Sequence, residues 1–329
     1  MPLSQVAVID NVELSFEQTV PRSLVHKRSL DNVLLTEIRA DEDDRFLCAG
    51  RLPTAHWFFN DAGRTPQKDI FFYTELCQQA SLAISHAFLD VDTDDVFIFE
   101  AAEAALTEAA WTISSQCEPV VVDVKILETT RRKDYAIGRV VAQYNIYLGA
   151  DRVFRGIGSL TVHPAALYQR LRRMSARNGS ATPRATQSDD VVESPVVCLL
   201  QGACDNVVIS RAEYVDNADE FVTSMIVDDG HPYFFDGPFD HVPGMLLLEG
   251  CAQLALATFA ETACAAPGTS GICAYDASFV RFVECGLPTT LRAYVDTADG
   301  SGHSVRISIL QNDVACGTTT MSIAFPIGV

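Results

Sequence analysis

Long apolar runs and targeting signals are missing from this sequence. No apolar stretch approaches the ~18 residues that a membrane-spanning helix requires. The start, MPLSQVAVID, lacks the basic segment followed by an apolar one that a signal peptide has. None of the ten cysteines forms a C-x-x-C pair, and no Cys/His spacing resembles a zinc site. We therefore expect a cytoplasmic protein with free thiols, no metal, no other cofactor and no membrane contact.

Positive charge is also scarce. The chain has 24 Lys and Arg against 43 Asp and Glu, a formal net charge of −19. Broad nucleic-acid binding needs a positive surface, so the composition argues against it. The 329 residues, 48% hydrophobic and 20% charged, are typical of a globular protein with about two domains.

What the sequence does contain is an internal repeat. DNV at 31–33 returns at 205–207, and HWFFND from His56 returns as HPYFFD from His231. ELCQQA from Glu75 is matched by EGCAQL from Glu249. The offset stays at 174 or 175 over about fifty residues, which indicates the duplication of one structural unit.

Each repeat predicts one long helix followed by strands. Apolar segments predict helices at Ile70–Phe88 and Met245–Glu261, and text rich in β-branched residues follows both. This pattern predicts an α+β fold in which an antiparallel sheet wraps a central helix in each half. A polar, strand-poor stretch between the halves predicts a linker. The expected boundaries are 1–168 for the first domain, 169–192 for the linker and 193–329 for the second domain.

A carboxylate and an amide share one face of each predicted helix. Glu249 and Gln253 are four residues apart, as are Glu75 and Gln79. A single glutamate at a helix rim is more often solvated than functional. Because the pair recurs in both halves behind a loop of histidine and aromatic residues, a functional site is favoured.

These motifs resemble a known family. P-G-x-L-x-x-E-x-x-A-Q, from Pro243 to Gln253, resembles the helix entry of hotdog-fold acyl-thioester enzymes, the 3-hydroxyacyl carrier protein dehydratases among them. VHKRSLDNVLLTE, HWFF and HPYFFDGPFDHVPGMLLLE more closely resemble the AfsA-type proteins of γ-butyrolactone (A-factor) biosynthesis. The resemblance implies a tandem hotdog fold. It also implies transfer of a β-ketoacyl group from acyl carrier protein, or from coenzyme A, to the hydroxyl of dihydroxyacetone phosphate.

Two positions depart from these patterns. A dehydratase would carry its histidine fourteen residues before the glutamate, where this chain has Phe235. The family often has arginine just before the helix glutamine, where this chain has Gln78 and Ala252.

Acyl transfer to an alcohol requires a base and donors for the carbonyl oxygen. We expect Glu249 to be the base, because a carboxylate on an apolar helix face has a raised pKa. Backbone amides near Gly244 and Met245 could polarise the carbonyl. The supporting residues are His231 and His241 for orientation or proton relay, Asp240 beside His241, and Gln253; Glu75, Gln79 and His56 form the equivalent set.

Sites of hotdog dimers lie between two units, so the resemblance places Glu249 against the His56 loop and Glu75 against the His231 loop. Which site is active stays open, with Glu249 favoured. A phosphorylated acceptor would require cations, and Arg281, Arg64 and Lys68 are the candidates. Basic segments at Arg131–Lys133 and 170–177 could receive an acidic carrier protein.

Three alternatives remain at this stage. The protein could be a thioesterase or a dehydratase with an altered pair of catalytic residues, or a non-catalytic binder of an acyl chain or butyrolactone. It could also form a homodimer. The recurrence of the carboxylate in both halves favours an enzyme over a binder, since a purely apolar pocket has no need of one.

Overall fold

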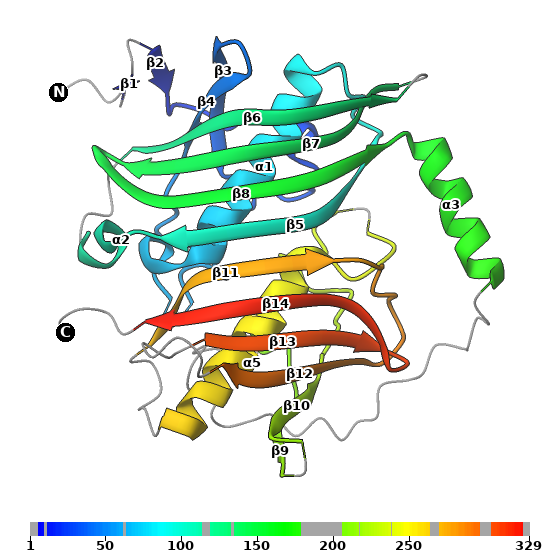
Figure 1. The fold of residues 1–329 in the computed structure, drawn as a ribbon. Helices are drawn as coiled ribbons and strands as arrows, with labels where there is room; N and C mark the ends of the chain where they lie inside the picture. Colours follow the sequence, from blue (N-terminus) through cyan, green and yellow to red (C-terminus); the bar gives the residue numbers. More distant parts are fainter. Residues whose placement is uncertain are drawn as a thin grey trace.

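The computed structural model describes ten segments of the chain (Figure 1): residues 6–9, 12–61, 64–113, 119–132, 135–178, 206–216, 218–237, 239–263, 270–296 and 304–324. Within these segments, no helix is both long enough and apolar enough to cross a membrane.

The two halves repeat one order of elements, a long helix followed by strands. The first half contains β1 (Val6–Ile9), β2 (Val12–Ser15), η1 (Arg22–Val25), β3 (Leu35–Glu42), β4 (Arg45–Gly50), η2 (Pro66–Lys68), α1 (Ile70–Phe88), β5 (Val96–Leu106), α2 (Glu108–Thr112), β6 (Val120–Arg132), β7 (Tyr135–Leu148), β8 (Asp151–His163) and α3 (Ala165–Asn178). The second half contains β9 (Glu213–Val215), β10 (Glu220–Ser224), α5 (Gly244–Ala263), β11 (Gly271–Phe279), β12 (Thr289–Asp296), β13 (Ser304–Gln311) and β14 (Val314–Ala324).

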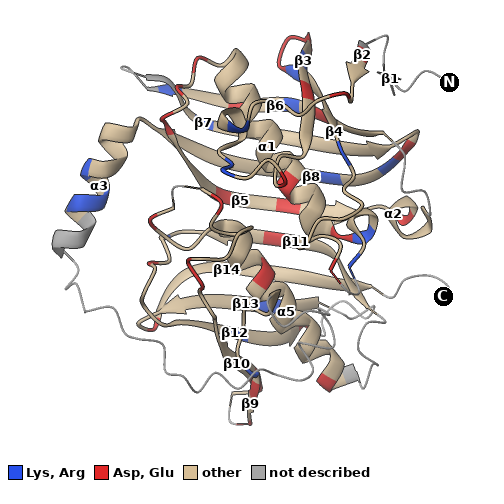
Figure 2. Cartoon of the chain, turned by 180° about the vertical axis from the view of Figure 1, so that it is seen from behind, with Lys and Arg blue, Asp and Glu red and all other residues tan. Residues whose placement is uncertain are grey.

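One antiparallel sheet runs through both halves. Its twelve strands follow the order β3-β4-β6-β7-β8-β5-β11-β14-β13-β12-β10-β9, while β1 and β2 form a separate hairpin. Helices α1 and α5 lie on the same face of this sheet (Figures 1 and 2). Each half is thus a long helix packed on an antiparallel sheet, so the α+β tandem hotdog expectation is confirmed.

A pseudo-two-fold axis relates the halves. The strands β5 and β11 occupy equivalent places and pair with each other where the two sheets join. At this seam Ala102 pairs with Ala277, the residue 175 positions later. The rings of Phe58 and Tyr233, also 175 positions apart, stack with centroids 4.3 Å apart and planes at 16°. Residues that are 175 positions apart in the sequence thus contact each other in both pairs. The pseudo-two-fold axis therefore passes between the partners of each pair.

The helix boundaries follow from local chemistry. Asp69 caps α1, because its carboxylate accepts a hydrogen bond from Phe71 N at 2.9 Å. Before α5, the carbonyl of Pro243 accepts from the amides of Leu246 and Leu247. The predicted bounds of α1 are confirmed, and α5 begins one residue earlier and ends two residues later than predicted.

The helix α3 leaves the end of β8 and runs toward the second half (Figure 1). It includes residues 169–178, which the sequence placed in the linker. Its polar composition predicted no packing, yet Tyr168 is buried and Arg172 forms ion pairs with Asp240 and Glu284 of the second half. Residues 179–192 lie outside the described segments, so the linker boundaries stay a prediction.

Candidate functional site

Two loops cross between the halves and bring the repeated motifs together. The Asn206 amide of the second DNV motif donates to Asp61, the last residue of HWFFND, at 2.7 Å. The Asn32 amide of the first DNV motif donates to Asp236, the last residue of HPYFFD, at the same distance. Each half therefore binds the histidine loop of the other half through its DNV asparagine.

The first cluster is built around Glu249, a residue that is only 1% exposed. Gln253 Nε2 donates to Glu249 Oε1 at 2.8 Å, and Arg64 from the His56 loop forms an ion pair with the same oxygen. Arg64 also binds Asp69, with Nη1 3.1 Å from Oδ2. One guanidinium thus serves two carboxylates, and Glu249 faces the His56 loop as predicted.

Charge and burial act on this pair together. Burial raises the pKa of Glu249, although the Arg64 charge and the Gln253 hydrogen bond act in the opposite direction. Burial tends to lower the pKa of Arg64, but Glu249 and Asp69 outweigh it and the pKa rises. The guanidinium also lies over the Phe58 ring, 4.5 Å from its centroid.

The second cluster is built around Glu75, which is equally buried. Lys27 Nζ and Gln79 Nε2 each lie 2.7 Å from Glu75 Oε1. The Tyr233 hydroxyl, from the His231 loop, donates to Glu75 Oε2 at 3.2 Å. Lys27 lies over the Tyr233 ring at 5.3 Å, which mirrors the placement of Arg64 over Phe58. Glu75 therefore faces the His231 loop, as predicted.

The two glutamates differ in the hydrogen bonding of the second carboxylate oxygen, Oε2. Both carboxylate oxygens of Glu75 are engaged, one by Lys27 and Gln79 and the other by Tyr233. Within the described segments, Glu249 Oε2 is buried and has no hydrogen-bond partner. A buried acceptor without a partner is costly unless a ligand or water satisfies it. The two clusters are therefore related by symmetry but differ in their capacity to bind a further donor.

Both loop histidines hold their own loops in shape. The backbone amides of Phe58 and Phe59 each donate to His56 Nδ1 at 3.2 Å, so Nε2 carries the proton and donates to Asn32 Oδ1 at 2.9 Å. His231 Nδ1 accepts from the amides of Tyr233 and Phe234 in the same way. Burial, reinforced by the Arg51 charge, lowers the pKa of His56 to about 4, so His56 is neutral at physiological pH.

The other predicted site residues lie elsewhere. His241 Nδ1 lies 2.8 Å from Asp240 Oδ1, which also accepts from the Tyr168 hydroxyl of α3 at 2.6 Å. The His241 ring packs on Phe282 with centroids 4.8 Å apart. Asp240 and His241 thus form a cluster with α3 at the entry to α5, and this cluster is separate from the contacts of Glu249.

Several predicted binding residues flank the start of α5 and α1. Gly244 begins α5 against Phe99, and a Cβ at this position would lie 2.8 Å from the Phe99 ring. Met245 is buried one turn before Glu249. Arg281 is exposed, and Lys68 is half-buried at the end of η2. Arg131, Arg170 and Arg173 are exposed, and Figure 2 shows basic residues gathered on α3; Lys133 lies outside the described segments.

Sequence reasoning missed Lys27, Asp69, Tyr233 and the Asn–Asp pairs. Lys27 and the asparagines lie in the motifs VHKRSLDNV and DNV, and Tyr233 lies in HPYFFD, so the repeat marked their positions. The repeat did not show which side chains meet across the halves, because that depends on the crossing of the loops. No group of three or more His, Cys, Asp or Glu side chains in the described part of the chain is arranged to hold a metal ion.

The fold and the paired buried glutamates define a double hotdog protein with two pseudo-equivalent sites between its halves. The chain belongs to the AfsA family, whose sequence model, described as the A-factor biosynthesis hotdog domain, matches residues 10–152 and 202–326. The two matched ranges correspond to the two halves of the molecule.

Curated relatives cover nearly the whole chain. A protein of Streptomyces virginiae named 2-oxo-3-(phosphooxy)propyl 3-oxoalkanoate synthase is 26% identical over 298 residues, which are 90% of this chain and 94% of the relative. A protein of the same name from Streptomyces coelicolor is 26% identical over 94% of this chain and 93% of its own length. The solved structure of an acyl-CoA thioesterase II from Mycobacterium marinum has a TM-score of 0.49 at 13% identity, and covers 94% of this chain and 99% of its own.

Proposed function

We propose that this protein transfers a 3-oxoacyl group from a thioester to the free hydroxyl of dihydroxyacetone phosphate. The name shared by the Streptomyces relatives describes an ester of a 3-oxoalkanoic acid. Its 2-oxo-3-(phosphooxy)propyl part is what remains of dihydroxyacetone phosphate when its hydroxyl oxygen becomes the ester oxygen. The acyl donor is a thioester of acyl carrier protein or coenzyme A. Such an ester is a precursor of γ-butyrolactone and related butenolide or furan signals.

This proposal is carried by Glu249 Oε2, a buried oxygen that has no hydrogen-bond partner among the described residues. It provides a buried acceptor beside a cation, Arg64, and one turn after the N-terminal end of an apolar helix. A hydroxyl group of the acceptor can donate to it. Glu75 offers no such place, since Lys27, Gln79 and Tyr233 engage both of its oxygens. We therefore assign the chemistry to the site of Glu249 and a supporting role to the site of Glu75.

The step is a single acyl transfer. Glu249 Oε2 accepts the proton of the acceptor hydroxyl while its oxygen attacks the thioester carbonyl carbon. The carbon–sulfur bond breaks, the electron pair leaves with sulfur, and the proton passes to the thiolate. Burial favours the protonated form of Glu249, which makes this carboxylate a stronger base than an exposed one. Arg64 keeps the carboxylate oriented.

The start of α5 supplies donors for the carbonyl oxygen. The amides of Leu246 and Leu247 are taken by Pro243 O, so those of Gly244 and Met245 in the first turn are our candidates for these donors. The positive end of the helix dipole supports a developing negative charge there. For the acceptor phosphate, exposed Arg281 and half-buried Lys68 remain the candidates, since Arg64 already serves two carboxylates.

The test is product analysis by mass spectrometry. Purified protein is incubated with a 3-oxoacyl thioester of acyl carrier protein or coenzyme A, with and without dihydroxyacetone phosphate. We expect the phosphorylated ester only when the acceptor is present. Free 3-oxo acid formed at the same rate in both samples would identify a thioesterase. Thioester binding without any turnover would identify a non-catalytic binder. A homodimer stays a separate prediction, which analytical ultracentrifugation can test.

A further inference from the structure

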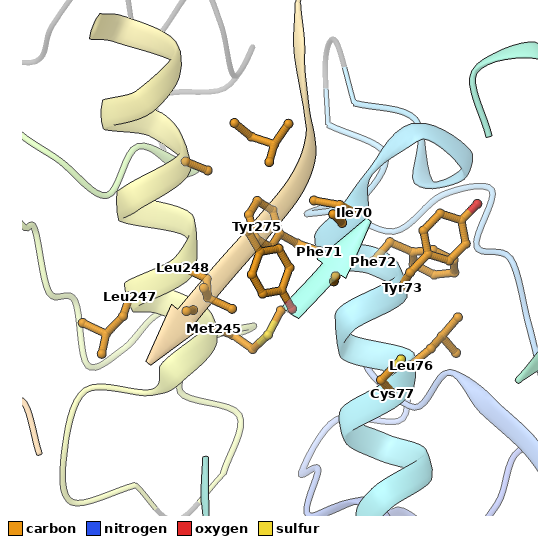
Figure 3. Packing of buried hydrophobic residues seen from close by; sticks show 14 of the residues in the cluster. Ile70, Phe71, Phe72, Tyr73, Leu76, Cys77, Met245, Leu247, Leu248 and Tyr275 are labelled. Carbon is orange, nitrogen blue, oxygen red and sulfur yellow. The ribbon is translucent and has the colours of Figure 1, made fainter. Parts of the chain in front are cut away.

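A cavity lies between α1 and the sheet in the first half, beside the seam between the halves. It is partly open, and its empty space is about 650 Å³ when the open solvent at its mouth is included. Its walls come from α1, β5, β7, β8 and β11, and Met245 of α5 also lines it. In Figure 3, Met245 reaches from α5 toward α1, and Tyr275 lies between the two helices.

Four hydroxyl groups of the cavity wall, those of Thr74, Ser81, Tyr144 and Tyr275, form hydrogen bonds within the protein. Thr74 Oγ1 donates to Ile70 O at 2.9 Å and accepts from the Tyr275 hydroxyl at 2.9 Å. Ser81 Oγ donates to Cys77 O at 2.7 Å and accepts from the Tyr144 hydroxyl at 2.6 Å. Because these hydroxyl protons are already donated, this part of the wall presents carbon surface to a ligand. The two tyrosines also connect α1 to the sheet on opposite sides of the cavity.

One row of paired residues crosses the sheet from the first half to the second. The side chains on this row explain why the cavity lies in the first half. It runs Ala142–Gly158–Ala102 in the first half and continues as Ala277–Thr319–Ile307 in the second. Gly158 thus corresponds to Thr319, and Ala142 corresponds to Ile307. Thr319 and Ile307 are fully buried. The first half therefore has less side-chain volume on the row where the second half has more.

We infer that this cavity binds the hydrocarbon chain of the acyl donor, and that Gly158 sets the length of chain it accepts. The inference rests on the proposed function for the identity of the donor. The largely apolar wall suits a straight alkyl chain, since the hydroxyls of Thr74, Ser81, Tyr144 and Tyr275 have no proton left to donate to a polar ligand. Met245 connects the cavity to the start of α5, one turn before Glu249. A chain in the cavity would place the carbonyl of its thioester at this helix end.

The Gly158 position can be narrowed without strain on the backbone. A Cβ there would lie 3.6 Å from the Tyr144 ring, which is ordinary contact. A valine side chain would extend farther into the cavity that Gly158 lines. The matched control is Thr319→Val, which places the same side chain at the equivalent position of the second half, where the Thr319 hydroxyl has no partner within the described segments.

The experiment measures binding directly by isothermal titration calorimetry, without an acceptor. The probes are 3-oxoacyl thioesters of N-acetylcysteamine with straight chains of increasing length. For the wild type and Thr319→Val, we expect affinity to rise with chain length. For Gly158→Val, affinity for short chains should be unchanged, while each methylene that no longer fits should lower affinity about fourfold. Gly158→Ala gives a smaller shift in the same direction and serves if the valine variant does not fold.

Three outcomes would overturn the inference: no dependence on chain length in the wild type, an equal loss at every length in Gly158→Val, or the same shift in Thr319→Val. Since binding is measured without turnover, these results are independent of ester formation. A protein that binds chains as expected but forms no ester would keep the cavity assignment and reject the proposed function.

Discussion

At the scale of single residues, the molecule contains two buried glutamates in equivalent places, each with a different set of binding partners. Glu249 is paired with an arginine from the other half, and Glu75 with a lysine from its own half. Tyr233 closes the second oxygen of Glu75, whereas its equivalent Phe58 has no hydroxyl to offer Glu249. The Tyr233 hydroxyl, which has no counterpart on Phe58, therefore accounts for the difference between Glu75 and Glu249: among the described residues, Oε2 has a hydrogen-bond donor only in Glu75.

Glu249→Gln should abolish most ester formation. The amide keeps the size of the side chain and the helix propensity, but it cannot accept the proton, and loss of a general base typically lowers the rate ~10²–10⁴-fold. Glu75→Gln should have a milder effect on the rate. The measurement is ester formation by both purified variants, with the melting temperature as a control. Near-normal activity of Glu249→Gln would remove it as the base, and a dead Glu75→Gln alone would move the chemistry to the other site.

His56 should make stability depend on pH. Its pKa in the folded protein, about 4, lies below the ordinary value of 6.5, because burial disfavours the charged ring. The unfolded chain therefore binds the proton first, and stability is lost as pH falls from about 6.5 toward 4, at most ~1.4 kcal/mol per pH unit for one histidine. His26, also lowered to about 4 by burial, contributes in the same direction.

Urea unfolding between pH 7.5 and 4.5 measures this dependence. In His56→Asn the slope should be smaller than in the wild type, because one group that takes up a proton on unfolding is gone. An unchanged slope would contradict the assignment of His56 as a buried neutral ring.

At the scale of elements, the crossing loops matter more than the helices. The lengths and starts of α1 and α5 could be predicted from apolar composition and the entry motif, because those signals are local. The sharing of Arg64 between Asp69 and Glu249 could not be predicted, since Arg64 and Glu249 are 185 residues apart in sequence. The α3 helix was also missed, because its packing depends on partners in the second half.

What covers the glutamate face of each helix also could not be predicted. The sequence indicated that a carboxylate and an amide share one face of each helix, and in the structure Glu75, Gln79, Glu249 and Gln253 are all buried. The DNV segment of the same half binds each glutamine, and a residue of the opposite half reaches each glutamate. A helical periodicity contains no record of what covers its polar face.

Asn32→Ala should loosen the contact between the halves. It removes a donor to Asp236 and to Pro232 O, and the acceptor of His56 Nε2. Each buried group left unpaired costs ~1–3 kcal/mol. Leu30→Ala, at an exposed position two residues away, is the matched control and should change stability little. Chemical unfolding of both variants tests the expectation, and equal stability of the two would show that the crossing contact is dispensable.

At the scale of the whole molecule, the seam between β5 and β11 makes one structure of two units. The shared core includes buried residues from both halves, and the sheet is continuous across the seam. Separation would expose two strand edges and would leave Glu249 without Arg64. The two halves therefore depend on each other for both stability and the site.

Residues 1–178 and 206–329, produced as two separate chains in one cell, should purify together as a complex. Each chain produced alone should be insoluble or unfolded. Its seam strand, β5 or β11, would lack its neighbour, and its member of the buried Arg64–Glu249 ion pair would be unpaired. Size-exclusion chromatography with circular dichroism decides the matter. A folded, monomeric single half would contradict the dependence of each half on the other.

The difference between the two halves along the sheet has a consequence for how the protein can evolve. It lies between the row Ala142–Gly158–Ala102 and its counterpart Ala277–Thr319–Ile307. In an assembly of two identical chains, every substitution occurs twice, so widening one side of the seam widens the other as well. A chain that carries both copies end to end is released from that constraint. One half can carry the smallest residue at Gly158 while the other half keeps a threonine at the equivalent position. Substitutions in the two halves can therefore be selected independently.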